Sequence, residues 1–185
     1  LAATRAGAVL VAPEIADAPG PATRIVIGEP MRALSLIAPS LGGEAASAPG
    51  IDPTARIGAG AVLGDGVRID PYAVIGDGAV IGADSVIKSH VVVEADVRIG
   101  TAVRIDPGAV IHRGAVLGDR VYIKARAVIG GPGFGFASDQ SGHQRIPQVG
   151  GCILGDDVEI GAGSCVDRGS LDDTVHLRAV LASTI

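Results

Sequence analysis

Aromatic residues are almost absent from this sequence. The 185 residues include no Trp, two Phe and two Tyr, so aromatics make up 2% of a chain that is 48% hydrophobic. A core must therefore be built from Ile, Val, Leu and Ala. Charged residues are also few, at 19%, but the aliphatic content is far too high for a disordered chain. The 28 glycines do not recur at every third position, which excludes a collagen-like helix.

Other absences exclude further classes of protein. No apolar run approaches the roughly 18 residues that a membrane span needs. The formal net charge is −5, which argues against nucleic acid as the main partner because phosphate binding needs clustered Lys and Arg. The two cysteines have neither a metal-binding nor a redox spacing, and the histidines are spread widely along the chain. We therefore expect no metal site and no cofactor. The histidines are His90, His112, His143 and His176.

A period of six residues dominates the chain from residue 51 onward. An aliphatic residue returns at every sixth position, and a small residue follows each one four positions later. A helix, with about 3.6 residues per turn, does not keep this period. The pattern predicts a solenoid of short parallel strands, in which three hexapeptides make one triangular coil and the aliphatic residues point inward. These residues are Ile51, Ile57, Leu63, Ile69, Ile75, Ile81, Ile87, Val93, Ile99, Ile105, Ile111, Leu117, Ile123 and Ile129.

Glycine often follows the inward residue of a hexapeptide. We expect these glycines to allow turn conformations that other residues resist. They are Gly58, Gly64, Gly76, Gly82, Gly100 and Gly118.

The repeat also predicts the domain boundaries. We expect a β-helix over residues 51–175, with a loop over residues 130–151 that projects from it. The repeat resumes at Leu154, Ile160 and Val166, but Asp172 stands where an aliphatic residue is expected. Residues 176–185 are therefore expected to be an unpatterned tail.

The first 50 residues follow a different pattern. Residues 8–11 and 24–27 predict two short strands, and residues 31–38 predict a helix with Pro30 at its start. We expect a small, partial α/β domain over residues 1–42. A linker over residues 43–50 follows it.

Residues eighteen positions apart are stacked in neighbouring coils of such a solenoid. Lys88, Asp106 and Lys124 would form an alternating ladder of charge, for which ordinary surface pairing is the simpler interpretation. The alternative is a basic patch of Lys88, His90, Lys124 and Arg126 that binds an acidic partner.

Two other pairs have a structural and a functional interpretation. Glu94 would lie one coil from His112, and a carboxylate beside an imidazole can orient a general base. Most such pairs are only surface contacts, which is the interpretation we favour. Phe134 and Phe136, the two Phe of the chain, either shape an apolar groove for a ligand or anchor the loop against a neighbouring surface.

Several segments resemble one family of acyltransferases. The hexapeptides resemble the left-handed β-helix acyltransferases, so the expected fold is an all-β solenoid, a left-handed parallel β-helix. Four segments resemble the UDP-3-O-acylglucosamine N-acyltransferases of lipid A biosynthesis. They are residues 128–137, with the sequence VIGGPGFGFA, residues 145–148 (RIPQ), residues 155–162 (GDDVEIGA) and residues 166–175 (VDRGSLDDTV). Residues 4–11 and 25–30 resemble the end of that family's uridine-binding domain.

The resemblance implies a reaction, partners and site residues. The family moves a 3-hydroxyacyl chain from acyl carrier protein to the 2-amine of UDP-3-O-acylglucosamine, as a homotrimer in the cytoplasm, with a His as general base. It implies substrate-binding roles for Glu29, Phe134, Phe136, Asp167 and Arg168. It also implies docking of the acidic carrier protein on Lys88, Lys124 and Arg126.

The sequence departs from the family at two places. The catalytic His of the family lies in a Gln-Ile-Ala-His-Asn segment, which we expect beyond Ile185, so we assign no catalytic residue in this chain. Glu29 stands before Pro30 where the family has an Asn flanked by aromatics. We therefore expect a truncated chain with little or no activity. The alternatives are another hexapeptide acyltransferase, or a non-catalytic β-helix that serves as a remnant or scaffold.

Overall fold

A computed structural model describes residues 3–42, 48–139, 142–176 and 180–181 of the chain. The chain forms two compact units, residues 1–47 and residues 48–185. Each unit is described by itself below. Part of the predicted linker, residues 43–47, lies outside the described residues.

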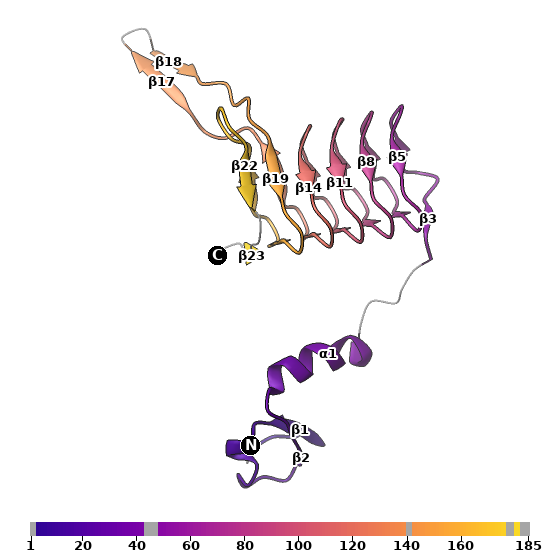
Figure 1. Ribbon diagram of the computed structural model, residues 1–185, viewed down its shortest axis with the longest axis vertical. Helices are drawn as coiled ribbons and strands as arrows, with labels where there is room; N and C mark the ends of the chain where they lie inside the picture. The colour runs from indigo at the N-terminus through magenta and orange to yellow at the C-terminus, as the bar shows by residue number, and fades with distance from the viewer. Residues whose placement is uncertain (1–2, 43–47, 140–141, 177–179, 182–185) are drawn as a thin grey trace. The chain divides into compact units, whose positions relative to one another are not determined.

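The first unit contains a short parallel sheet and one helix (Figure 1). Strand β1 (Ala8–Val11) pairs with β2 (Thr23–Val26), and a 3-10 helix, η1 (Pro13–Ile15), lies between them in sequence. Helix α1 (Pro30–Gly42) follows. Both predicted strands and the predicted helix are therefore confirmed, and the helix is four residues longer at its C-terminal end than the prediction. Pro30 begins the helix because its ring already holds the helical φ angle.

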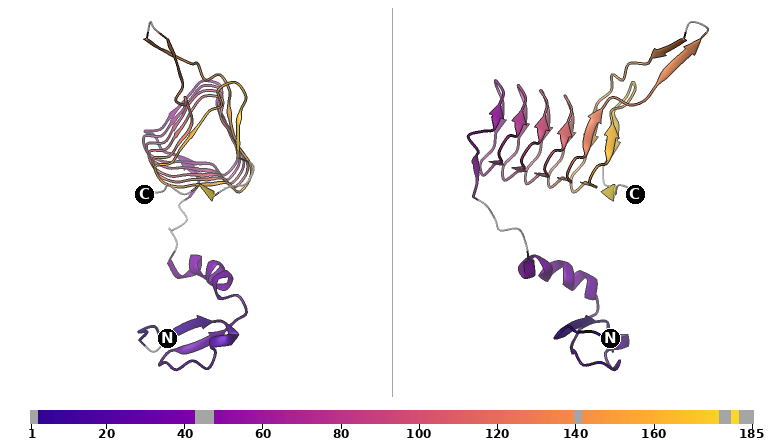
Figure 2. Two further views of the ribbon diagram at one scale, coloured as in Figure 1. Left: turned by 90° about the vertical axis from the view of Figure 1, so that its left-hand side faces the viewer. Right: turned by 180° about the vertical axis from the view of Figure 1, so that it is seen from behind.

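The second unit is a parallel β-helix of triangular coils, as the left-hand view of Figure 2 shows along the axis. Three parallel sheets form its faces, and a strand of only two residues is typical of each. The predicted solenoid of hexapeptides is thus confirmed. The strands of each sheet pair in register at eighteen-residue spacing until the loop at residue 130, as Ile75 pairs with Val93 and Val93 with Ile111.

The three sheets are named here by their order in the chain. Sheet I consists of β3 (Gly50–Ile51), β6 (Arg68–Ile69), β9 (Val86–Ile87), β12 (Arg104–Ile105), β15 (Tyr122–Ile123), β20 (Glu159–Ile160) and β23 (Val180–Leu181). Sheet II consists of β4 (Arg56–Ile57), β7 (Val74–Ile75), β10 (Val92–Val93), β13 (Val110–Ile111), β16 (Val128–Gly131) and β21 (Cys165–Asp167). Sheet III consists of β5 (Val62–Leu63), β8 (Val80–Ile81), β11 (Arg98–Ile99), β14 (Val116–Leu117), β19 (Cys152–Leu154) and β22 (Thr174–His176).

The core of the β-helix is a column of aliphatic side chains. Ile87, Ile105, Ile111, Ile123 and Ile129 have no exposed surface, whereas Ile51 in the first coil is 51% exposed. Each fully buried side chain of this size contributes about 1.5–3 kcal/mol through the hydrophobic effect. A narrow prism of this kind has no room for large rings, which explains the scarcity of aromatics.

The role predicted for the glycines after the inward residues is wrong. None of these six glycines has a positive φ angle. They are required by crowding instead: a Cβ added at Gly100 would lie 2.6 Å from the carbonyl carbon and oxygen of Gly118 in the next coil. At this spacing even a methyl group forces the two backbones apart.

The predicted loop projects from the β-helix, but part of it is regular structure. Strand β17 (Phe136–Asp139) and β18 (Gly142–Arg145) form an antiparallel hairpin that extends away from the coils (Figures 1 and 2). The repeat then resumes as predicted, because Leu154, Ile160 and Val166 are buried and pair with the coil before the loop.

The prediction of an unpatterned tail after residue 175 is wrong for the described residues. His176 in β22 pairs with Leu154, and Val180–Leu181 pair with Glu159–Ile160, so two of the three sheets continue. The pattern was hidden because residues 168–173 form a bend that lengthens the turn and shifts the phase of the repeat. Residues 177–179 and 182–185 lie outside the described residues.

Candidate functional site

Glu94 and His112 lie together on sheet II, as their spacing predicted. Each directly follows the inward residue of its strand, Val93 or Ile111, in neighbouring coils. The Nδ1 atom of His112 lies 3.3 Å from Oε1 of Glu94, and their side chains are 26% and 40% exposed. Because a neutral imidazole that donates from Nδ1 carries no proton on Nε2, this pairing leaves Nε2 as a hydrogen-bond acceptor.

Glu94 is held as an anion by its surroundings. The backbone N–H of Arg113 donates to Oε2 at 2.8 Å, and this hydrogen bond lowers the pKa of the Glu94 carboxyl. The hydrogen bond with His112 and the charge of Arg168 lower it further, while partial burial opposes the shift. The carboxylate is therefore ionised at neutral pH and orients the imidazole.

The chain makes a tight turn directly above this pair. Gly130 has a φ angle of +74°, a conformation that favours glycine, and it follows the buried Ile129. The turn shifts the register between β16 and β21, so that Gly131 pairs with Asp167. We call the turn and its surroundings the glycine corner, consisting of Gly130, Gly131 and Gly133 with His112, Gln148 and Asp167.

Arg168 stabilises the backbone of the glycine corner through hydrogen bonds. Its Nε donates to the carbonyl oxygen of Gly130 at 2.8 Å, and a second guanidinium nitrogen lies 3.3 Å from the carbonyl oxygen of Arg113. Its own backbone N–H donates to the carbonyl oxygen of Gly131. The substrate-binding role predicted for Arg168 therefore stays a prediction, and the contacts of its guanidinium in the structure are with backbone.

Asp167, by contrast, presents a carboxylate without a partner. The residue is exposed, and its carboxylate makes no hydrogen bond or ion pair with any residue that the structure describes. A Cβ added at Gly133 would lie 3.5 Å from Asp167 Oδ2 and 3.5 Å from Gln148 Oε1. Gln148 Oε1 accepts a hydrogen bond of 2.6 Å from the Ser170 hydroxyl. Sequence reasoning missed Gln148 as a site residue, although it ends the RIPQ segment that carries the family resemblance.

The projecting loop carries two Phe side chains next to a hydrogen-bonded pair of polar side chains. The rings of Phe134 and Phe136 lie 5.1 Å apart at their centroids, and Phe134 is 93% exposed. With Ser138 and His143 they line a pocket of about 400 Å³, and the Ser138 Oγ lies 2.7 Å from His143 Nδ1. Phe134 packs on no described part of this chain, so its ring is open to an apolar ligand or to a neighbouring surface, and its substrate-binding role stays a prediction.

The predicted basic residues lie on the side of the prism formed by sheet I, but they are not a uniform patch. The Lys124 amine lies 2.5 Å from Glu159 Oε1, and this contact raises the pKa of Lys124. Lys88 is flanked along its column by Asp70 and Asp106, and it too has an interaction partner. Ordinary surface pairing therefore describes Lys124, although its partner is Glu159 and not Asp106 of the predicted ladder, whereas Arg126 is exposed at the corner.

Two further contacts lie on this side of the prism, a stack of two rings and a hydrogen bond from a Tyr hydroxyl. The ring of His90 stacks on Tyr72 at a centroid distance of 5.2 Å. The Tyr122 hydroxyl donates to Asp106 Oδ2 at 2.6 Å. Both pairs link adjacent coils, so they stabilise the stack and need no ligand to explain them.

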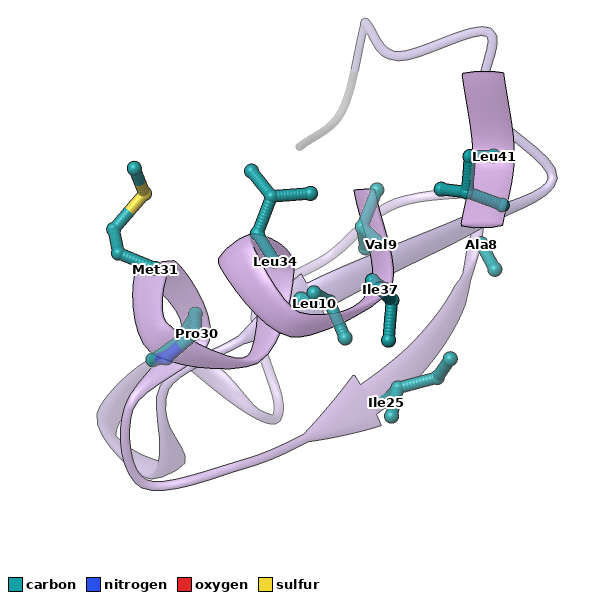
Figure 3. Close-up of a pocket in the computed structure, with 9 residues that line it drawn as sticks. All are labelled: Ala8, Val9, Leu10, Ile25, Pro30, Met31, Leu34, Ile37 and Leu41. Atoms are coloured by element: carbon teal, nitrogen blue, oxygen red, sulfur yellow. The ribbon is translucent and has the colours of Figure 1, made fainter. Parts of the chain in front are cut away.

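Glu29 lies in the first unit, directly before helix α1. Its Oε2 is 3.6 Å from the Arg32 guanidinium, and both side chains are largely exposed. Beside it, β1, β2 and α1 enclose an apolar pocket of about 470 Å³ (Figure 3). Its lining residues are Ala8, Val9, Leu10, Ile25, Pro30, Met31, Leu34, Ile37 and Leu41, so Glu29 is not one of them.

Within the described ranges, no three or more His, Cys, Asp or Glu side chains gather closely enough to hold a metal ion. No helix in the same part of the chain is long and apolar enough to cross a membrane.

The β-helix of this chain is similar to a known family model and to solved structures. The family model for the bacterial transferase hexapeptide (six repeats) matches residues 60–95 and 96–131. Among solved structures, PerB from Caulobacter crescentus in complex with CoA and GDP-perosamine superposes with a TM-score of 0.53 at 22% identity, covering 83% of this chain and 63% of that one. The fold and the repeats define the chain as a hexapeptide-repeat β-helix protein.

Similarity to curated proteins is more specific. The UDP-3-O-acylglucosamine N-acyltransferase of Leptothrix cholodnii is 44% identical over 178 residues, which cover 95% of this chain and 52% of the relative. The enzyme of that name in Alkalilimnicola ehrlichii is 38% identical over 95% of this chain and 50% of its own length. These matches confirm the predicted resemblance to the UDP-3-O-acylglucosamine N-acyltransferase family. The chain spans about half the length of these two relatives.

Proposed function

We propose that this chain is part of an N-acyltransferase of lipid A biosynthesis. The proposed reaction moves a 3-hydroxyacyl chain from acyl carrier protein to the 2-amine of UDP-3-O-acylglucosamine. The observation that carries this proposal is 44% identity to a UDP-3-O-acylglucosamine N-acyltransferase over 95% of the chain. The amine attacks the thioester carbonyl, a base takes the amine proton, and the carrier thiol leaves.

The site residues divide between the two substrates in this proposal. The exposed Phe134 and Phe136 would contact the acyl chain, and the polar glycine corner would face the sugar. The acidic carrier protein would dock on the side of Lys88, Lys124 and Arg126, where Lys124 must exchange Glu159 for the partner. We assign Glu29 to the uridine end of the acceptor as a prediction only. Assembly as a homotrimer in the cytoplasm completes the proposal.

The general base of the family is not assigned to any residue of this chain. The 185 residues contain no Gln-Ile-Ala-His-Asn segment. The alternative function is a β-helix that binds the substrates or a partner without catalysing transfer. The two candidates differ in whether the β-helix supports transfer when it is joined to the segment of a relative that carries the family's His.

A graft tests the proposal. Residues 1–173 of this chain replace the matching segment of the Leptothrix cholodnii relative, which supplies the remaining parts. The graft is then assayed with 3-hydroxyacyl carrier protein and, separately, with acetyl-CoA. We expect transfer from the carrier protein to UDP-3-O-acylglucosamine. A folded graft without transfer would favour the non-catalytic function, and a preference for acetyl-CoA would favour another hexapeptide acyltransferase.

A further inference from the structure

We propose that the glycine corner binds the amino-sugar ring of the acceptor, with Asp167 and Gln148 accepting hydrogen bonds from its amine and a neighbouring hydroxyl. The inference rests on the proposed function, because it names the part of the acceptor that this corner holds. It also assigns Glu94 as a positioning residue, which acts through His112.

Two glycines of the corner lie next to the polar side chains. A Cβ added at Gly131 would lie 3.6 Å from Nε2 and Cδ2 of His112, which is ordinary contact distance. A Cβ at Gly133 would meet Asp167 and Gln148 at similar distances. Because Gly133 has no side chain, nothing at that position stands between Asp167 Oδ2 and Gln148 Oε1, and Asp167 is exposed at the corner.

The polar atoms that face this space are hydrogen-bond acceptors. Asp167 has no partner among the described residues, and Gln148 Oε1 has accepted only the Ser170 hydroxyl, which leaves one lone pair free. His112 Nε2 is an acceptor because Nδ1 faces Glu94. Each of the three groups therefore keeps an open acceptor position, which fits a ligand that is rich in N–H and O–H groups, as an amino sugar is.

The cations beside the corner do not compete for this ligand. The Arg168 guanidinium faces the carbonyl oxygens of Gly130 and Arg113, and the Arg113 guanidinium pairs with Asp96 Oδ2 at 3.0 Å. Both guanidinium groups therefore already have hydrogen-bond partners in this chain. For this reason the corner does not favour the diphosphate of a sugar nucleotide. The unpaired carboxylate of Asp167 favours an ammonium group instead.

Glu94 sets the acceptor state of His112. Its carboxylate is anchored by the Arg113 backbone N–H, so it offers a fixed partner to Nδ1. Without that partner the imidazole is free to adopt either tautomer and to rotate. We then expect a mixture of the two tautomers of His112. In one of them Nε2 carries the proton and donates a hydrogen bond instead of accepting one.

Binding of two probes to the 185-residue chain tests the proposal. The probes are UDP-glucosamine and UDP-glucose, which differ at the 2-position by an amine and a hydroxyl. We expect UDP-glucosamine to bind more tightly and to shift the amide resonances of Gly131, Gly133 and the Gln148 side chain. Asp167→Asn should weaken UDP-glucosamine binding about tenfold and leave UDP-glucose unchanged, the effect of losing one charge-assisted hydrogen bond.

Matched variants keep this test specific. Asp65→Asn makes the same change at an exposed carboxylate of another corner and should leave both affinities unchanged. Glu94→Gln should lower the fraction of the Nδ1–H tautomer of His112, read from its ring nitrogen resonances, while the fold is retained. Equal binding of the two probes, an equal loss of both in Asp167→Asn, or an unchanged tautomer in Glu94→Gln would each overturn the corresponding assignment.

Failure of this inference is distinguishable from failure of the proposed function. If the graft transfers acyl groups but Asp167→Asn leaves its KM for the acceptor unchanged, the function holds and the corner does not bind the sugar. If the graft is inactive but the amine-selective binding is present, the corner binds an amino sugar and the proposed reaction fails.

Discussion

His112 Nδ1 lies 3.3 Å from Glu94 Oε1, although one coil of the β-helix separates the two residues in sequence. The eighteen-residue coil brings them together, because each follows the inward residue of neighbouring strands in sheet II. The pair therefore depends on the stacking of coils, and it reports on that stacking.

The Glu94–His112 pair predicts a pH-dependent stability difference. Glu94→Gln should lower the free energy of unfolding by about 0.5–1 kcal/mol at pH 7, since the pair is partly exposed and screened. The pKa of Glu94 is lowered below its ordinary value of 4.5 in the folded state, so its contribution is present above that value. The difference between the two proteins should vanish as the pH falls through the lowered pKa. Urea unfolding at several pH values measures it; a difference that persists in acid far below the ordinary value of 4.5 would contradict the assignment.

The core column predicts a gradient of mutational cost along the β-helix. Ile111 is fully buried in the middle, and Ile51 in the first coil is 51% exposed. Ile111→Ala should cost about 3–4 kcal/mol because it leaves a cavity among packed side chains, whereas Ile51→Ala should cost about 1 kcal/mol. Chemical denaturation of both variants checks the ranking. Similar losses at the two positions would show that the first coil is packed as tightly as the middle.

The crowding at Gly100 predicts a large effect of a single methyl group. Gly100→Ala places Cβ 2.6 Å from the Gly118 backbone, so the coils must separate, and we expect a loss of more than about 2 kcal/mol. Gly163→Ala is the control, because nothing lies within 4 Å there although φ is +69°. That variant should cost about 1 kcal/mol from backbone strain alone. Melting temperatures separate the two causes, and an equal loss would contradict crowding as the reason for Gly100.

Removal of the Phe134 ring should change activity without changing stability. Because its side chain is 93% exposed, Phe134→Ala should leave the melting temperature unchanged. In the grafted enzyme it should lower kcat/KM for a long 3-hydroxyacyl donor about tenfold, since burial of a large ring against the acyl chain would be lost. A short-chain donor should be affected much less. A uniform loss for both donors would assign Phe134 to something other than the acyl chain.

The sequence predicts the fold and only part of the site. The six-residue period determines which residue is buried, and it correctly places Glu94 beside His112. It does not show that Arg168 faces backbone carbonyls or that Gln148 reaches the glycine corner. Those contacts join a coil to a loop that lies outside the repeat, so no spacing rule describes them. The continuation through His176 was missed for the same reason, since a bend of a few residues breaks the phase without ending the sheets.

The chemical identity of the product is the most direct test of the account. The graft is supplied with 3-hydroxyacyl carrier protein and UDP-3-O-acylglucosamine, and the product is analysed by mass spectrometry before and after mild base, which cleaves esters but leaves amides intact. We predict one new acyl group that survives the treatment, which places it on the 2-amine. A new acyl group lost as readily as the 3-O-ester, or no product from a correctly folded graft, would contradict the proposed N-acyltransferase.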